Sequence, residues 1–339
     1  MPGNRLTLSS RPDVATDVIF FQMKEQLEAL NGITINFGEG GMFIVNIILA
    51  FVMFGVALGI KLQTFKDVFT NPKSVIMGVV SQWVILPAVT FLIALALNPL
   101  ITPMIALGMI LVASCPGGNI SNFISSLSKG NVELSVSMTA ITTAFAPIVT
   151  PFNFFFWGSL YSRFISIRND IPTLVIPFGP MLEQILLLLG VPIFLGLVFS
   201  HYFPNATKKI TKPAQILSIL LFIGMVTVSF SQNFQIFIDN IFYVFFIVML
   251  HNASALMSGY FTGRLGKLPE RDVRSLTVET GIQNSGLGLI LLFNNAIFPA
   301  EIWHGHYGGM LFITAWWGIW HIISGLSVAY YFRRKPLQA

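Results

Sequence analysis

Long apolar stretches alternate with short polar segments along almost the whole chain. Nine stretches approach or exceed the ~20 residues that a helix needs to cross the hydrocarbon of a bilayer. They are Gly41–Ile60, Ser74–Leu97, Pro103–Ser126, Val132–Leu160, Ile176–Tyr202, Ile216–Phe234, Phe237–Leu265, Val273–Phe298 and Gly308–Phe332. The pattern predicts an all-α, multi-pass membrane protein with nine transmembrane helices. Within the N-terminal tail, residues 1–40, the mixed segment 14–30 is typical of an amphipathic helix at the membrane interface.

Composition supports a membrane protein. The chain is 54% apolar and 10% charged, which excludes an ordinary soluble domain and a disordered one. It has no basic run of the kind that binds nucleic acid, and nothing in it indicates an obligate protein partner; membrane lipid is the expected surroundings. The lone cysteine, Cys115, excludes an intrachain disulfide.

The basic residues predict an orientation. If the loops alternate between the two sides, most of the 19 Lys and Arg residues fall on the side of Arg333-Arg334-Lys335. Cytoplasmic loops carry such an excess. The N-terminus is therefore expected outside and the C-terminus inside a plasma (bacterial inner) membrane.

Two apolar stretches contain dense polar sequence that lipid does not tolerate. The first is Ala113–Asn122, which carries Pro116, Gly117 and Gly118; the second is Glu279–Gly286, which carries Gly281 and Gly286. These Pro and Gly residues are the expected helix breaks. One broken helix in each half of a chain indicates the binding site of a secondary transporter built from inverted repeats. The last five stretches would form one repeat, and the first four would form the other without its first helix.

Glu279 is the most informative single residue. A carboxylate in mid-membrane costs about 2.5–3.5 kcal/mol on insertion scales, so it needs a cation, a proton or water. Gln283 follows four residues later on the same helical face. Hard oxygen ligands of this kind suit alkali or alkaline-earth cations rather than zinc or copper. The alternative is a structural glutamate held by interhelical hydrogen bonds.

The first half offers matching oxygens. Ser121 and Asn122 follow the Pro-Gly-Gly break, and Ser135 and Thr139 lie four residues apart on the next helix. Each alone is weak evidence, because Ser and Thr commonly bond to their own helix. Together with Glu279 they predict an oxygen cage for a cation.

Asn119, Asn284 and Ser285 lie at the two breaks. A half-helix that resumes after a break presents free N–H groups and a positive dipole end, which attract an anion. The substrate is therefore expected to be an organic anion. The alternative is that Asn119 only caps its helix.

Three further polar residues lie inside apolar stretches. Gln82 is either a ligand or a hydrogen-bonding contact between helices. His251 and His321 are either proton relays or structural histidines. His304 and His306, in the expected outside loop 300–309, lack the further ligands that a transition-metal site requires.

These motifs resemble the bile acid:sodium symporter family. The resemblance runs from about residue 41 to 331 with matching order and spacing. The segments that carry it are Cys115–Asn122, Gly130–Ser135 with Thr139, Ala146–Pro151, Glu279–Gly286 and Trp320–Gly325.

The resemblance implies two sodium ions. The first site would comprise Ser121, Asn122, Ser135, Thr139 and Glu279. The second would comprise Gln82, Glu279, Gln283 and the backbone carbonyls of Thr280 and Ile282. It also implies a transporter domain, 41–339, with panel helices (41–70 and 172–235) and core helices (71–162 and 236–332). The core would contain two crossing broken helices, and substrate would bind near their crossing, at Asn119, Ser121, Asn284, Ser285 and His321.

The expected function is sodium-coupled symport of an organic anion by alternating access. A bile acid or sterol conjugate and a small hydroxy acid such as pantoate both fit the family. No catalytic residues are expected. The alternatives are a transporter driven by protons through Glu279 and His321, a ligand sensor that does not transport, and a membrane enzyme that uses Glu279 and a histidine as acid and base. No nucleophile or metal motif favours the enzyme.

Overall fold

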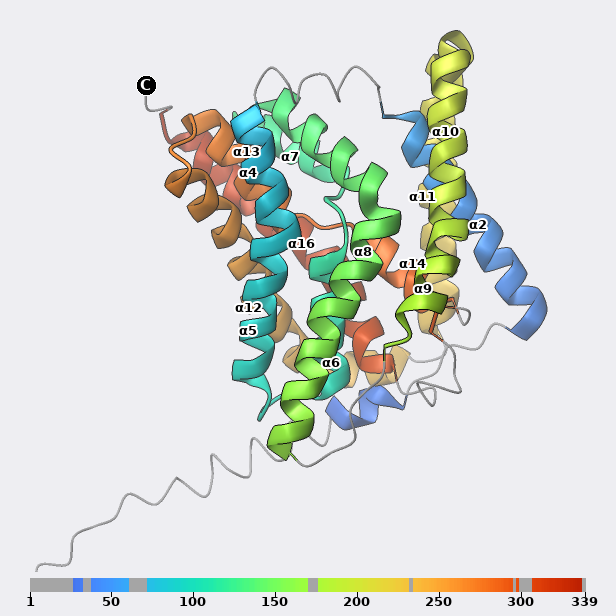
Figure 1. The fold of residues 1–339 in the computed structure, drawn as a ribbon, viewed down its shortest axis with the longest axis vertical. Coiled ribbons are helices and arrows are strands. Elements are labelled where there is room, and N and C mark those ends of the chain that lie inside the picture. Colours follow the sequence, from blue (N-terminus) through green and yellow to red (C-terminus); the bar gives the residue numbers. More distant parts are fainter. Residues whose placement is uncertain are drawn as a thin grey trace, which may run out of the picture.

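The computed structural model describes residues 27–32, 38–60, 72–169, 176–231, 234–294, 297–298 and 307–336, and every named element in these ranges is helical. Figure 1 shows their arrangement. The elements are α2 (Gly38–Leu58), α4 (Pro72–Val80), η1 (Ser81–Ile85), α5 (Leu86–Leu97), α6 (Pro103–Ser114), α7 (Ile120–Leu127), α8 (Val132–Asn169), α9 (Phe178–Ile185), η2 (Leu186–Gly190), α10 (Val191–Tyr202), α11 (Pro204–Ser231), α12 (Phe234–Leu265), α13 (Glu270–Gly281), α14 (Ser285–Leu292) and α16 (Gly308–Arg334).

Five continuous helical segments in the described ranges are long and apolar enough to cross a membrane. They are Pro72–Leu97, Val132–Arg168, Phe178–Tyr202, Val244–Leu265 and Gly308–Arg334. Two other predicted stretches are divided: Pro103–Ser126 forms α6 and α7, and Val273–Phe298 forms α13 and α14. These stretches are divided because each contains one of the two polar interruptions.

Some predicted boundaries differ from the structure. The helix expected over 132–160 continues to Asn169, because the exposed Arg163 and Arg168 do not interrupt a helix. Gly286, expected at a break, lies in the first turn of α14. The expected tail helix over 14–30 lies outside the described residues except for 27–30, where Leu27 and Leu30 are buried against the protein. Residues 301–306, with the two loop histidines, also lie outside them.

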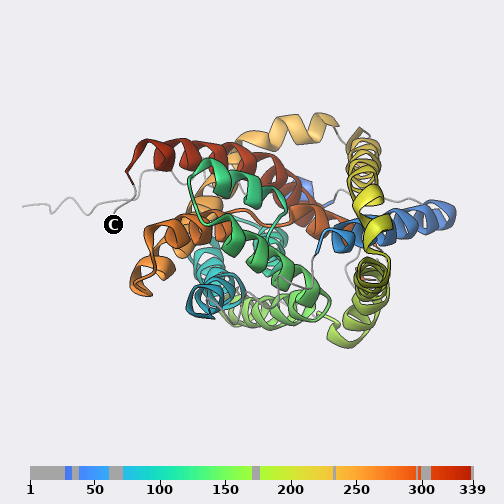
Figure 2. The same ribbon diagram turned by 90° about the horizontal axis from the view of Figure 1, so that it is seen from above.

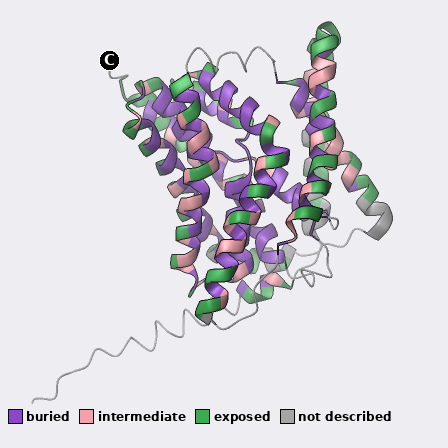
Figure 3. Ribbon diagram, in the orientation of Figure 1, coloured by how far each residue is buried: buried purple, intermediate pink, exposed green. Residues whose placement is uncertain are grey.

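The helices form two groups. In the first, α2 packs against both α10 and α11. Figures 1 and 2 show these three helices along one side of the molecule. The remaining long helices pack around α6, α7, α13 and α14, and Figure 3 shows that buried residues concentrate in this second group.

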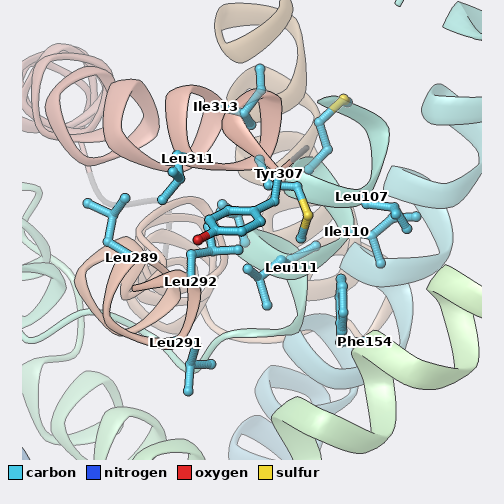
Figure 4. Close-up of a cluster of buried hydrophobic side chains, with 14 of the residues drawn as sticks. Leu107, Ile110, Leu111, Phe154, Leu289, Leu291, Leu292, Tyr307, Leu311 and Ile313 are labelled. Carbon is cyan, nitrogen blue, oxygen red and sulfur yellow. The ribbon is translucent and has the colours of Figure 1, made fainter. Parts of the chain in front are cut away.

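A large apolar cluster fills much of the second group and extends to buried residues of α2 and α10 in the first group. Side chains of α6, α14 and α16 gather around Tyr307, as Figure 4 shows, and Phe154 of α8 joins them. The N-terminus of α6 is capped, because Thr102 Oγ1 accepts a hydrogen bond from Ile105 N. Pro103 occupies the first turn, where its missing N–H is not needed.

A π-helical turn, η1, positions Gln82. Pro87 has no N–H, and its ring crowds the carbonyl of residue 83, so a widened turn before it relieves the clash. The carbonyl of Trp83 then accepts a hydrogen bond from Asn153 Nδ2 at 3.0 Å. The widened turn carries Ser81 and Gln82 towards α13, where both are buried.

Candidate functional site

The two helix breaks lie against each other. Gly117 and Gln283 form an antiparallel bridge, with Gly118 N bonded to Ile282 O and Asn284 N bonded to Pro116 O, each at 2.8 Å. A broken helix within a membrane must find new partners for its backbone groups. Here each break supplies partners for the other, which fixes the ends of four half-helices at one place.

Gly117 leaves room for this contact. A Cβ on it would lie 2.9 Å from Glu279 Oε2 and 3.2 Å from Gln82 Nε2. Any larger residue would therefore displace polar groups of the site. Gly281 serves in the same way on the other break, since its Cβ would lie 2.3 Å from the Leu256 side chain.

The carboxylate of Glu279 lies at the centre of a hydroxyl cluster. Glu279 precedes the end of α13 by two residues and is fully buried. Its Oε1 accepts hydrogen bonds from Ser121 Oγ, at 2.5 Å, and from Ser135 Oγ. Thr139 Oγ1 lies 3.1 and 3.0 Å from the two carboxylate oxygens. α7 and α8 are thereby joined to α13.

The cluster holds more oxygen lone pairs than protons. The three hydroxyls carry one proton each, and Asn122 Oδ1 is a further acceptor, 2.9 Å from Ser135 Oγ and 3.4 Å from Thr139 Oγ1. Among the described residues, no Lys or Arg forms an ion pair with Glu279. Because a buried, unpaired carboxylate is costly, this oxygen-rich cluster is suited to a hard cation.

A second group of oxygens lies beside the last turn of α13. Gln82 Nε2 donates to Glu279 O at 3.0 Å, and Gln283 Nε2 donates to Thr280 O at 2.9 Å. The Oε1 atoms of both glutamines are buried without a hydrogen-bond partner. Ile282 O accepts a backbone N–H from the other break. Unpaired amide oxygens beside a carboxylate residue again fit a hard cation.

A cavity of about 320 Å³ opens between the breaks and helices α2 and α11. Asn119, Asn284, Ser285 and His321, the residues expected around substrate, all line it. Ser121 does not: it is fully buried against Glu279. The structure therefore brings four of the five expected substrate residues to one cavity and places the fifth in the carboxylate cluster.

The two break asparagines differ. Asn284 caps α14, because its Oδ1 accepts a hydrogen bond from Leu287 N at 3.0 Å. Asn119 occupies the corresponding position of α7 but makes no capping bond, so the capping interpretation of Asn119 is wrong. Its exposed side chain lines both this cavity and a neighbouring one of about 290 Å³ that also contacts Asn122 and Thr139.

The sequence analysis missed the residues that hold the end of α13. Asn252 Nδ2 donates to Gly281 O at 2.7 Å, and Ser324 Oγ donates to Asn252 Oδ1. Ser81 and Thr280 hydroxyls bond at 2.9 Å. Ser324 lies in Trp320–Gly325, one of the motifs that carried the family resemblance, so the sequence offered a reason to single it out. It offered no such reason for Asn252 or Ser81.

His251 lies outside this site. Its Nε2 bonds to Thr90 Oγ1 at 2.8 Å, and its ring packs on Trp317 with 4.6 Å between centroids. These contacts support the structural interpretation of His251 rather than a proton relay.

A buried arginine organises the end of the bundle beyond the cluster. The Arg274 side chain is fully buried, pairs with Glu270 at 3.2 Å, and donates to Ser128 O and Phe332 O. Arg264 pairs with the same Glu270 at 2.6 Å but is 38% exposed. The start of α13, the turn after α7 and the end of α16 are thus joined at the end of the molecule where the C-terminus lies (Figure 1).

Broken helices that meet at a polar centre within a bundle of apolar helices are a feature of secondary transporters of the membrane. The chain belongs to the Sodium Bile acid symporter family, whose sequence model matches residues 46–240. It is accordingly an integral, multi-pass protein of the plasma membrane and a member of a sodium-dependent transporter family rather than an enzyme family.

Three relatives place it within that family. It is 30% identical over 292 residues to the uncharacterized sodium-dependent transporter YocS of Bacillus subtilis, covering 86% of this chain and 83% of that protein. It is 31% identical to the probable sodium/metabolite cotransporter BASS2 of rice, covering 72% of this chain but only 55% of the rice protein. It is 27% identical to the ileal sodium/bile acid cotransporter of rabbit, covering 72% and 67%.

Proposed function

We propose that this protein couples the entry of sodium to the transport of an organic anion. One observation carries the proposal: the fully buried carboxylate of Glu279 accepts hydroxyl donors from α7 and α8 and has no basic partner among the described residues. A sodium ion beside it would neutralise its charge and supply the missing partner.

In this proposal each of the two oxygen groups would bind one sodium ion. The first would contact Glu279 with the hydroxyls of α7 and α8 and Asn122. The second would contact the free amide oxygens of Gln82 and Gln283 with carbonyls of the last turn of α13. Because both groups include Glu279 and both flank the joined breaks, ion binding would stabilise one arrangement of the four half-helices.

The cavity supports an anionic substrate. The N-terminal ends of α7 and α14 lie along it, through residues 119–120 and 284–287. The positive dipole ends of these two helices favour negative charge, and the start of α7 has no side-chain cap. A bile acid, another sterol conjugate and a small hydroxy acid remain the classes that the family offers.

The two helix groups support transport by alternating access. In this proposal nine spans, N-terminus outside, form an inverted repeat in which α2, α9, α10 and α11 are the panel and the remaining helices, with the crossing broken pair, are the core. The substrate cavity lies between the breaks on one side and α2 and α11 on the other. Relative movement of panel and core would therefore change which side of the membrane the cavity opens to.

The driving force follows from charge. Two sodium ions carried with a monovalent anion move one net charge, which contributes about 2.3 kcal/mol per 100 mV. Since sodium and substrate would favour the same arrangement, each would raise the affinity for the other.

Uptake into proteoliposomes tests this function. A sodium gradient should drive accumulation of an organic anion, and replacing sodium with potassium or choline should abolish it. Accumulation driven by a pH gradient without sodium would identify the proton-coupled alternative. Binding in detergent without accumulation under either gradient would identify a sensor.

A further inference from the structure

Two polar residues of α11 line the substrate cavity on the side away from the breaks. Gln215 and Ser218 lie three residues apart, so they share a face of the helix. Both line the cavity of about 320 Å³ that Asn119 and Asn284 line from the other side. Gln215 also lines the adjoining cavity of about 290 Å³.

Two glycines make room for these side chains: Gly55 in α2, and Gly59 in the turn that follows its last residue, Leu58. A Cβ on Gly59 would lie 2.9 Å from Gln215 Nε2, and a Cβ on Gly55 would lie 2.9 Å from Ser218 Oγ. Gly55 lies within α2, and Gly59 N bonds to Val56 O in the turn that ends the helix. Close approach of small residues is a common basis of helix packing in membranes, and here it holds two polar groups at the edge of the cavity.

The hydrogen-bonding capacity of both side chains is unused. Ser218 is 5% exposed, and its Oγ is buried without a partner. No hydrogen bond to the Gln215 side chain occurs among the described residues. In contrast, the hydroxyls of Thr207, Thr211 and Thr227 on the same helix each bond to the carbonyl four residues earlier. A buried hydroxyl that does not bond to its own helix needs another partner.

We propose that Gln215 and Ser218 form a polar subsite that hydrogen-bonds to the transported anion. The anionic group would face the starts of α7 and α14, and a hydroxyl or amide elsewhere on the same molecule would face α11. The ligand class is therefore an organic anion that carries a second, hydrogen-bonding group. In this proposal the Ser218 side chain would turn about χ1, so that its hydroxyl, which lies beside Gly55, reaches the ligand. This inference rests on the proposed function, because it concerns the same cavity.

The subsite also gives the substrate a mechanical role. Gln215 and Ser218 belong to the helix group of α2 and α11, whereas Asn119 and Asn284 belong to the broken helices. A ligand that bonds to both would connect the two groups, and a ligand without the second polar group would contact only one through hydrogen bonds.

Ligand-dependent thermal stabilisation of the purified full chain in saturating sodium tests the subsite. The probes are pantoate, its hydroxyl-free counterpart 3,3-dimethylbutanoate, and taurocholate. The variants are Ser218→Ala and Gln215→Met, with Thr227→Ala as the matched control on the same helix. We expect each of the first two variants to weaken pantoate binding roughly three- to tenfold, with 3,3-dimethylbutanoate binding and sodium stabilisation unchanged. Thr227→Ala should change none of them.

The outcomes separate this inference from the proposed function. Unchanged pantoate affinity in both variants, or an equal loss for the two acids, overturns the subsite. Stabilisation by taurocholate alone, unaffected by the variants, overturns it and leaves sodium-coupled anion transport intact. A wild-type protein that no anion stabilises in sodium overturns both. Ser218 and Gln215 are changed in separate variants, so if one variant misfolds the other still tests the subsite.

Discussion

Ser121 Oγ lies 2.5 Å from Glu279 Oε1, although 158 residues separate them in the chain. Ser121 stands in the first turn of α7, just after one break, and Glu279 stands two residues before the other. The contact therefore joins the two broken helices through the group that we propose binds sodium. Substitutions of the residues around Glu279 should therefore change sodium binding or the stability of the fold in predictable directions.

Ser135→Ala should weaken sodium binding. The substitution removes a hydroxyl bonded to the Glu279 carboxylate, and a hydrogen bond to a charged group contributes about 1.5–3 kcal/mol. We expect sodium-dependent stabilisation to require roughly 10- to 100-fold more sodium, as measured by thermal unfolding across a sodium titration. Ser137→Ala, on the same helix, is the control because Ser137 bonds only to its own helix at Glu133 O; an equal effect of both substitutions would contradict the account.

Gly117→Ala should destabilise the fold and disturb the ion site. The new methyl group would lie 2.9 Å from Glu279 Oε2, and overpacking of this kind costs about 1–3 kcal/mol. Gly224→Ala is the matched control, since a Cβ there meets nothing within 4 Å. Replacing a helical glycine by alanine in open space should stabilise by about 0.5–1 kcal/mol. Thermal unfolding in sodium-free buffer should show a lower midpoint for Gly117→Ala and a higher midpoint for Gly224→Ala. Midpoints that shift in the same direction would refute the close approach of Gly117 to the Glu279 carboxylate.

Asn252→Ala should loosen the end of α13. It removes the donor to the buried Gly281 O, which costs about 1–3 kcal/mol, and leaves Ser324 Oγ with His321 O as its acceptor. We expect a lower midpoint of thermal unfolding and weaker sodium binding together, because the carbonyls of the same turn are proposed ligands. Ser327→Ala, an exposed position that bonds only to its own helix, should be silent. Unaltered stability of the Asn252 variant would exclude this positioning role.

Arg274 and Arg264 offer a matched comparison because both pair with Glu270. Removing the buried Arg274 leaves uncompensated polar groups and should cost about 3–5 kcal/mol, whereas Arg264 is 38% exposed and should contribute at most about 1 kcal/mol. The measurement is the free energy of unfolding of Arg274→Ala and Arg264→Ala. Comparable losses would show that burial does not determine the strength of this network.

Much of the fold and the site could be predicted from sequence because membranes impose simple rules. Long apolar stretches predicted the helices, and the dense polar runs around Pro116 and Glu279 predicted where two of them divide. Single polar residues gave less: Asn252, Ser81 and Ser218 look like any isolated polar residue in an apolar helix. Only the packing of distant helices distinguishes Asn252, bonded to Gly281 O, from Ser218, with a free hydroxyl.

The exact ends of the helices depended on local contacts. Gly286 was expected to break a helix, but Asn284 caps Leu287 N at once and the helix resumes before it. Glycine permits a break without requiring one. Likewise, the sequence placed Ser121 both at the ion and at the substrate, and the structure places its side chain on Glu279, outside the cavity lining.

The central claim is that the buried carboxylate of Glu279 binds sodium, and Glu279→Gln tests it most directly. The substitution keeps the shape of the side chain and removes its charge; one oxygen still accepts hydrogen bonds, and the other is replaced by an NH2 donor. We predict that the purified variant folds with at least wild-type stability in sodium-free buffer and that added sodium no longer stabilises it, while potassium has no effect on either protein. Sodium stabilisation of the Glu279→Gln protein equal to that of the wild type would contradict the account.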